Sequence, residues 1–298
     1  MTIVKQFKKE KLKLEQQKTL APFTSLKIGG KASYYLAVSS SEELRKAIHL
    51  ANKLKMPYYI LGNGSNTLVL DYGVDGLVLH LSNRFSKIEL IDETTIRCEA
   101  GALLKDVCLF ALEHNLSGME DLYGIPASVG GALYMNAGAF EGEIKDVVTS
   151  CEYIDQDGTL LTFHPSDMYL SYRHSYFMNK TGCIATITFS LKEGEHSAIK
   201  EKMDYYYQRR VDKQPLEYPS AGSTFKRPYH NYASALIDQC KLKGYRINDA
   251  EVSTKHAGFL INKGNATSKD FIELILYIQS IVYLETGFKL HPEVQILR

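Results

Sequence analysis

Apolar residues change their spacing twice in the first third of the chain, and this predicts two strands with a helix between them. Short apolar runs at 33–38 and 58–61 predict the strands. Ser40 and Glu43 form the capping-box pattern that opens a helix, and Pro57 ends it. Five apolar residues recur at helical spacing in between: Leu44, Ala47, Ile48, Ala51 and Leu54. A strand–helix–strand unit of this kind predicts parallel strands.

The rest of the chain predicts an α+β protein. Short apolar or alternating runs predict strands at 67–70, 76–81, 87–91, 95–99, 148–155, 159–163, 183–191, 258–262 and 294–297. Helical spacing predicts helices at 102–115, 195–210, 232–241 and 268–286. The last helix is expected to begin at a Thr267 cap and to end at Gly287. Because Gln214 and Pro215 break the polar helix at 195–210, we expect a domain boundary there, and three parts overall.

Charge and composition exclude several classes of protein. The 298 residues carry 35 Lys and Arg against 34 Asp and Glu, and a net charge of +1 gives no dominant field for nucleic acid. The five cysteines lie far apart and no histidines have metal-ligand spacing, so free thiols and no metal are expected. No run approaches the ~20 apolar residues of a membrane span, so no membrane insertion is expected. The charged stretch at 8–13 is unlike a signal peptide, which favours a cytoplasmic location.

A basic segment around Ser223 offers a hydroxyl beside fixed positive charge. Ser223 follows Gly222 and precedes Lys226 and Arg227, and Pro228 predicts a rigid turn. Because nearby cations stabilise an alkoxide, Ser223 is a candidate general acid, or an anchor for an anionic ligand. Taken alone, the segment fits a basic surface turn better.

Two glycine-rich loops predict a site for a phosphate-bearing ligand. The first loop opens into a strand, and its backbone N–H groups can form an anion nest. It contains Gly62, Asn63, Gly64, Ser65 and Asn66. The second loop precedes helix-forming residues, so a helix N-terminus is expected beside it. Its candidate contacts are Gly124, Ile125, Pro126, Ser128, Val129, Gly130 and Gly131, continued by Asn136 and Gly138. The first loop alone fits an ordinary hairpin turn, but the two loops together suit a pyrophosphate held from two sides.

Several shorter motifs accompany these loops in a fixed order. They are Thr24-Ser25-Leu26-Lys27-Ile28-Gly29-Gly30, Tyr172-Arg173-His174-Ser175, Gly222-Ser223-Thr224-Phe225-Lys226, Gly244-Tyr245-Arg246, His256-Ala257-Gly258-Phe259 and His291-Pro292-Glu293-Val294. From about residue 20 to the C-terminus, the set resembles the UDP-N-acetylenolpyruvoylglucosamine reductase (MurB) family, flavoenzymes of peptidoglycan precursor synthesis.

The resemblance implies a fold, cofactors and a substrate. The fold is a two-part domain of the vanillyl-alcohol-oxidase/PCMH type that binds FAD non-covalently, at 1–82 and 83–200, with the C-terminal end returning to the first part. Residues 201–298 are then an α+β substrate-binding domain. NADPH is the implied electron donor, and UDP-N-acetylglucosamine enolpyruvate is the implied small-molecule substrate, reduced to UDP-N-acetylmuramate.

The resemblance also assigns roles to individual residues. It implies that Arg173 and Glu293 stabilise the negative charge that forms at C2 when hydride reaches C3, and that Ser223 protonates C2. Substrate contacts are implied for Arg210, Lys213, Lys226, Arg227, Tyr245 and His256. Two positions depart from the family pattern. Ala127 stands where the family often has Gly, and Arg227 stands where many members have Asn.

The segment after Arg173 is short. Only residues 175–182 precede the strand expected at 183, too few for a lid that reaches over the substrate and returns. The chain therefore resembles the shorter, type II form of the family, in which the C-terminal domain closes the site, and a monomer is expected.

Two other functions are compatible with the sequence. One is an oxidase of sugars or hydroxy acids with the same fold. The glycine-rich loops contain no His or Cys, which argues against the oxidases that bind flavin covalently. The other is an inactive nucleotide-sugar-binding protein, which would be colourless or would lack Arg173, Ser223 or Glu293, and all three are present.

Overall fold

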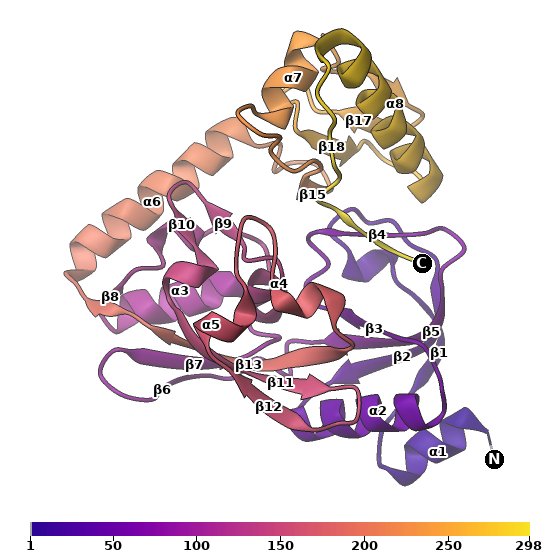
Figure 1. Ribbon diagram of the computed structural model, residues 1–298, viewed down its shortest axis with the longest axis vertical. Coiled ribbons are helices and arrows are strands. Elements are labelled where there is room, and N and C mark those ends of the chain that lie inside the picture. The colour runs from indigo at the N-terminus through magenta and orange to yellow at the C-terminus, as the bar shows by residue number, and fades with distance from the viewer. Residues whose placement is uncertain (1) are drawn as a thin grey trace. The chain divides into compact units, whose positions relative to one another are not determined.

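The computed structural model describes residues 2–298, which form two compact units (Figure 1). The first unit contains the chain up to Gln16, then Tyr34–Asn63 and Gly76–Arg209. The second contains Gln17–Ser33, Gly64–Asp75 and Arg210–Arg298. Both units are therefore built from separate stretches of sequence. The predicted parts 1–82, 83–200 and 201–298 have other boundaries, and that division stays a prediction.

The first unit contains a five-stranded antiparallel sheet, in the order β12-β11-β13-β7-β6. Its strands are β6 (Ile88–Leu90), β7 (Thr95–Glu99), β11 (Val148–Asp155), β12 (Leu160–Phe163) and β13 (Gly182–Ser190). Three helices accompany them: α3 (Leu104–Glu113), α4 (Val129–Tyr134) and α5 (Pro165–Met168). Helix α4 packs against β13 and β7, so the second glycine-rich loop is anchored to the middle of this sheet.

A four-stranded sheet in the order β1-β2-β5-β3 has most of its residues in the first unit. Its strands are β1 (Glu15–Thr19), β2 (Lys31–Val38), β3 (Tyr58–Leu61) and β5 (Val74–Leu81). Strands β3 and β5 run parallel. Helix α1 (Ile3–Lys9) precedes the sheet and buries Phe7. Neither α1 nor β1 is predicted from the sequence.

Helix α2 (Ser41–Lys53) follows β2 as predicted and packs against β11 and β13. Its buried face includes the predicted residues Leu44, Ala47, Ile48 and Ala51. The Ser40 hydroxyl oxygen accepts a hydrogen bond from the N–H of Glu43 at 3.1 Å, as a capping box requires. The second bond of a capping box would join the Glu43 carboxylate to the N–H of Ser40. Here the carboxylate accepts instead from the N–H of Ser39, one residue earlier, at 2.9 Å.

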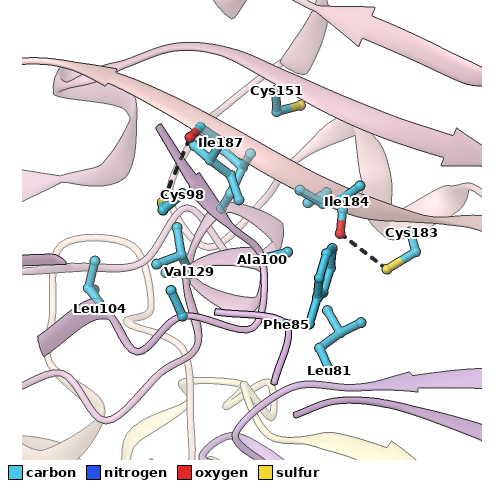
Figure 2. Packing of buried hydrophobic residues seen from close by; sticks show 14 of the residues in the cluster. Leu81, Phe85, Cys98, Ala100, Leu104, Val129, Cys151, Cys183, Ile184 and Ile187 are labelled. Atoms are coloured by element: carbon cyan, nitrogen blue, oxygen red, sulfur yellow. Dashed lines mark hydrogen bonds between the residues drawn. The ribbon is translucent and has the colours of Figure 1, made fainter. Parts of the chain in front are cut away.

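The core of the first unit contains four of the five cysteines. Figure 2 shows Cys98, Cys151 and Cys183 among apolar residues of the sheet and of α4. The Cys98 thiol donates to the carbonyl of Ile187 at 3.8 Å. Burial raises the pKa of Cys151 to about 12, so this thiol stays protonated and unreactive. The predicted free, buried thiols are confirmed for these residues and for Cys108, whereas Cys240 is half-buried.

Short elements link the larger ones. The strands β8 (Leu116–Ser117) and β14 (Lys192–Glu193) pair with each other, as do β9 (Gly138–Ala139) and β10 (Gly142–Glu143). Turns of 3₁₀ helix occur at Ala21–Phe23, Glu120–Leu122, Ile144–Asp146 and Tyr176–Asn179. The long helix α6 (His196–Lys213), visible in Figure 1, begins in the first unit and contributes its last four residues, 210–213, to the second.

The second unit is an antiparallel sheet, in the order β15-β18-β17-β16, with two helices. The strands are β15 (Ser220–Ser223), β16 (Arg246–Ile247), β17 (Ala250–Val252) and β18 (Phe259–Asn262). The helices are α7 (Ala233–Gln239) and α8 (Ser268–Thr286). A parallel pair joins β4 (Thr67–Val69) to the C-terminal strand β19 (Gln295–Leu297).

Helix α8 illustrates how local sequence fixes an element of this unit. Thr267 and Asp270 form a complete capping box at its start. Gly287, at φ +75°, ends it in the left-handed conformation that glycine adopts without strain. The buried face includes Phe271, Leu274, Ile275, Ile278 and Val282. Burial of each large apolar side chain stabilises the unit by about 1.5–3 kcal/mol.

A half-buried histidine in the first unit predicts a loss of stability in acid. The Tyr35 hydroxyl lies 2.6 Å from Nδ1 of His80, and burial lowers the pKa of His80 from 6.5 to about 4. Below pH 6.5 the unfolded chain binds a proton that the folded chain binds only near pH 4. The contribution of His80 to the free energy of unfolding is therefore complete above pH 6.5. It falls by on the order of 2–3 kcal/mol between pH 6.5 and 4.

The measurement is urea denaturation at pH 7 and at about pH 4.5, on the wild type and on His80→Gln. The variant is expected to lose less stability than the wild type between the two pH values. An equal loss in both proteins would show that other groups dominate.

Candidate active site

Hydrogen bonding in the second unit brings Ser223 and Glu293 to neighbouring positions. Ser223 ends β15, and the carbonyl of the next residue, Thr224, accepts a hydrogen bond from the N–H of Glu293 at 2.8 Å. A bridge between Phe225 and Pro292 continues this pairing. Two of the three candidate catalytic residues therefore lie on neighbouring backbone segments although they are far apart in the sequence.

Ser223 lies at the end of a strand, and the prediction of a rigid basic turn at this residue is wrong. Ser223 pairs with Phe259 of β18, a contact that local sequence does not reveal. Gly222 has φ +72°, and a Cβ there would meet no atom within 4 Å, so the backbone conformation alone favours glycine. The Ser223 side chain is exposed. The Arg227 guanidinium lies 4.6 Å from the Tyr232 ring.

Arg173, in the first unit, is held by two backbone carbonyls. Its Nη2 donates to the carbonyl of Gly138 at 2.8 Å, and its Nη1 lies 3.4 Å from the carbonyl of Asn136. The guanidinium carbon lies 5.0 Å from the Tyr172 ring. Arg173 also has φ +51°, an uncommon conformation for a residue with a side chain. Anchoring of this kind fixes the orientation of the planar guanidinium group, whose N–H donors can bind a carboxylate.

Asn136 organises the segment that supports Arg173. Its side chain is fully buried. Its Nδ2 donates to the carbonyl of Ser171 at 3.0 Å and to the carboxylate of Glu143 at 3.2 Å. Its Oδ1 accepts from the N–H of Lys145 at 3.0 Å. The side chain is thus engaged by protein groups, and a cofactor contact of Asn136 stays a prediction.

The two glycine-rich loops meet in the first unit. Nδ2 of Asn63 donates to the carbonyl of Pro126 at 2.7 Å. A Cβ on Gly62 would lie 2.3 Å from Oγ of Ser128, so a larger residue at position 62 would displace this hydroxyl. Ser128 in turn caps α4, because its Oγ accepts from the N–H of Gly131 at 3.3 Å. The expected helix therefore begins within the second loop, at Val129, although it is only six residues long.

The remainder of the first loop belongs to the second unit, where it contacts the segment that carries Glu293. A Cβ on Gly64, at φ +63°, would lie 2.1 Å from the carbonyl of Phe23. Nδ2 of Asn66 donates to the carbonyl of Glu293 at 3.1 Å, and the N–H of Gln295 donates to the carbonyl of Asn66 at 2.9 Å. A loop expected at the cofactor thus also fixes the backbone of a candidate catalytic residue.

Comparison with known proteins assigns the chain to a family. Residues 214–297 match the family described as UDP-N-acetylenolpyruvoylglucosamine reductase, C-terminal domain, and residues 32–164 match the FAD binding domain. UDP-N-acetylenolpyruvoylglucosamine reductase of Clostridium botulinum (strain Eklund 17B / Type B) is 43% identical over 284 residues, 95% of this chain and 93% of that protein. The chain belongs to the UDP-N-acetylenolpyruvoylglucosamine reductase family.

Two further reductases agree with this assignment. The enzyme of Clostridium novyi (strain NT) is 44% identical over 275 residues, 92% of this chain and 89% of that protein. The crystal structure of the reductase (MurB) from Thermus caldophilus superimposes with a TM-score of 0.82 at 34% identity, covering 96% of this chain and 99% of that one. The predicted oxidoreductase class, the FAD cofactor and the α+β fold with a separate C-terminal domain are confirmed.

The loops of this reductase-family chain fit a non-covalent FAD. They offer glycine backbone and small polar side chains, and residues 62–66 and 124–132 contain no His or Cys to which a flavin could be attached. Ala127, where the family often has Gly, is absent from the residues with positive φ, so it introduces no strain within residues 2–298. The individual cofactor contacts stay predictions.

The predicted substrate contacts of the reductase lie in the second unit. Arg210 is 6% exposed, whereas Lys213 is exposed at the end of α6. The backbone N–H of Lys226 donates to the carbonyl of His291 at 2.8 Å, extending the pairing beside Ser223. Their roles toward substrate stay predictions.

His256 is held by a backbone hydrogen bond, and Tyr245 is held by a stacked aromatic ring. Nδ1 of His256 accepts from the N–H of Gly258 at 3.1 Å, and burial lowers the pKa of His256. The neutral ring therefore carries its proton on Nε2, where it can donate. The Tyr245 ring stacks on Tyr277 with centroids 4.3 Å apart, and a hydrogen bond to Tyr277 raises the pKa of Tyr245.

The short segment after Arg173 is compact, as predicted for a chain without a long lid. Tyr176–Asn179 form a 3₁₀ turn in which Phe177 is buried. The Tyr176 ring lies 5.3 Å from the Phe163 ring. The segment therefore packs within the first unit.

Among residues 2–298, no cluster of three or more His, Cys, Asp or Glu could hold a metal ion. No helix in that range combines the length and apolar character that crossing a bilayer requires. The monomeric state and the cytoplasmic location stay predictions.

Proposed function

We propose that this chain reduces UDP-N-acetylglucosamine enolpyruvate to UDP-N-acetylmuramate, with NADPH as the electron donor. FAD held by the two glycine-rich loops would supply the hydride that reaches C3 of the enolpyruvyl group. The observation that most supports the proposal is the backbone pairing of Thr224 with Glu293, which brings the chain segments of Ser223 and Glu293 together. Membership in the reductase family supports the identity of the substrate.

The roles of the three residues follow from the charge that forms during reduction. When hydride adds to C3, the C2–C3 π bond breaks and its electron pair moves to C2 and into the substrate carboxylate. Arg173 binds this carboxylate, because its fork is already fixed by carbonyls of the first unit. Glu293 stabilises the enolate through a hydrogen bond that it donates when protonated. Ser223 gives its proton to C2, completing the new C–H bond, and water returns a proton to the serine.

Serine is a weak acid, so the proposal requires positive charge near Ser223. Lys226 and Arg227 follow it in the chain, and Arg210 and Lys213 come from α6. These cations favour the alkoxide and also suit the diphosphate of the substrate. We assign them jointly to these two tasks.

The proposal predicts a yellow protein that releases its flavin. The loops lack a His or Cys for covalent attachment, so acid precipitation should leave flavin absorbance in solution and a colourless pellet. Steady-state NADPH consumption should then depend on the enolpyruvyl sugar, and UDP-N-acetylglucosamine should not replace it. Flavin retained in the pellet, or reoxidation by O₂ as fast as by the enol ether, would favour an oxidase, and a colourless protein would favour a binding protein.

A further inference from the structure

The hairpin formed by β9 and β10 carries one of the carbonyls that hold Arg173. Gly138 of β9 accepts the Arg173 hydrogen bond at 2.8 Å. Phe140, at the tip of this hairpin, has φ +55° and is 39% exposed. An aromatic residue in the left-handed region persists only where surrounding contacts compensate for the strain. The tip is therefore expected to be held by something outside the hairpin.

Two side chains of α6 contact Phe140 from within the first unit. The Phe140 and Tyr206 rings are stacked, with centroids 4.4 Å apart and planes 22° apart. The Arg209 guanidinium carbon lies 4.8 Å from the centre of the Phe140 ring. Tyr206 is itself buried. The aromatic tip is thus fixed to a long helix by ring stacking and a cation–π contact.

The second strand of the hairpin has its own contact beside α6. A Cβ on Gly142 would lie 2.9 Å from the Cβ of Asp121, so the strand packs tightly on this residue. Nζ of Lys202, from α6, lies 3.7 Å from the Asp121 carboxylate. The helix α6 and the hairpin therefore share Asp121 in addition to the Phe140 contact.

We propose that Phe140 is a positioning residue for Arg173: its stacking on Tyr206 and Arg209 fixes the hairpin whose Gly138 carbonyl directs the guanidinium. The inference rests on the proposed role of Arg173 toward the substrate carboxylate. Phe140 acts only through the hairpin backbone, and the alignment it secures matters because a displacement of about 1 Å can slow a reaction ~10²-fold.

The experiment compares Phe140→Ala with Phe140→Tyr, which keeps the ring, and with Tyr205→Ala. Tyr205 lies on the same helix and contacts Tyr206 and Arg209, and it provides the matched control. Phe140→Ala is expected to slow the reoxidation of reduced flavin by the enolpyruvyl sugar, seen as recolouring, about 10- to 100-fold. The reduction of the flavin by NADPH, seen as bleaching, should change little. Hydrogen exchange at the amides of residues 138–143 should accelerate. Phe140→Tyr should restore both readouts, and Tyr205→Ala should change neither by more than about two-fold.

A double-mutant cycle separates this inference from the proposed function. If Phe140 acts through Arg173, adding Phe140→Ala to Arg173→Lys should slow the recolouring step little further. Full activity of Arg173→Lys would contradict the proposed function of Arg173. Three outcomes would contradict the positioning role of Phe140 and leave the proposed function standing. Recolouring could be slow in Arg173→Lys but fast in Phe140→Ala, or the rate losses of the two single variants could multiply in the double variant. The third outcome is a rate loss in Tyr205→Ala equal to that in Phe140→Ala.

Discussion

Ser223→Ala is expected to leave bleaching of the flavin by NADPH nearly intact and to slow recolouring by the enolpyruvyl sugar by roughly 10²–10⁴-fold. The reason is the order of events, because a proton is needed at C2 only after hydride has reached C3. The side chain is exposed at the end of β15, so its removal should not unfold the second unit. Stopped-flow absorbance, with each half-reaction measured separately, gives both rates.

Ser220→Ala provides a control for this experiment. Ser220 begins the same strand and pairs with Ile261 of β18, so it tests the effect of losing a serine from β15. Both half-reactions of this variant are expected to match the wild type. Equal slowing of the two half-reactions in Ser223→Ala would instead assign Ser223 a structural or ligand-binding role.

Glu293→Gln and Arg173→Lys are expected to lower kcat far more than they raise KM, by roughly 10²–10³-fold for loss of one stabilising group. Both residues are assigned to charge that develops in the transition state. The Gln amide can still donate a hydrogen bond, but it is a far weaker acid than a protonated carboxyl group and stabilises the developing negative charge less. Lys keeps the charge of Arg173 but loses the planar fork that Gly138 and Asn136 hold.

Steady-state kinetics with the enolpyruvyl sugar measure both constants. Glu285→Gln, at an exposed position near the end of α8, controls for the effect of a Glu-to-Gln change in the second unit. A fully active Arg173→Lys would make this residue a surface cation. A rise in KM with unchanged kcat would make either residue a simple binding group.

Elements with strong local signals were predictable from the sequence. Helix α8 has the predicted bounds, because Thr267, Asp270 and Gly287 fix its ends through neighbouring residues. The apolar face of α2 is also as predicted. In contrast, α1 is a single short helix with one buried residue, Phe7, and its charged sequence gives little helical pattern to detect.

The candidate site was predictable as a set of residues but not as an arrangement. The pairing of Thr224 with Glu293 joins segments far apart in the chain, and no local pattern specifies it. For the same reason Ser223 was expected in a turn, although β18 makes it the end of a strand. The sequence also does not reveal that the buried side chain of Asn136 supports the segment that holds Arg173, and its cofactor contact stays a prediction.

The support of Arg173 by Phe140 illustrates the same limit. The high number of tyrosines in α6 was visible in the sequence and had no assigned role. Only the structure places Tyr206 on the Phe140 ring.

The most direct test of the proposed reductase activity is an anaerobic single turnover. The yellow protein is bleached with one equivalent of NADPH, and one equivalent of UDP-N-acetylglucosamine enolpyruvate is then added without oxygen. We predict full recovery of the yellow colour and a product heavier than the substrate by two hydrogen atoms, at the mass of UDP-N-acetylmuramate. A protein that stays bleached until oxygen is admitted, with the enolpyruvyl sugar unchanged, would contradict the proposal.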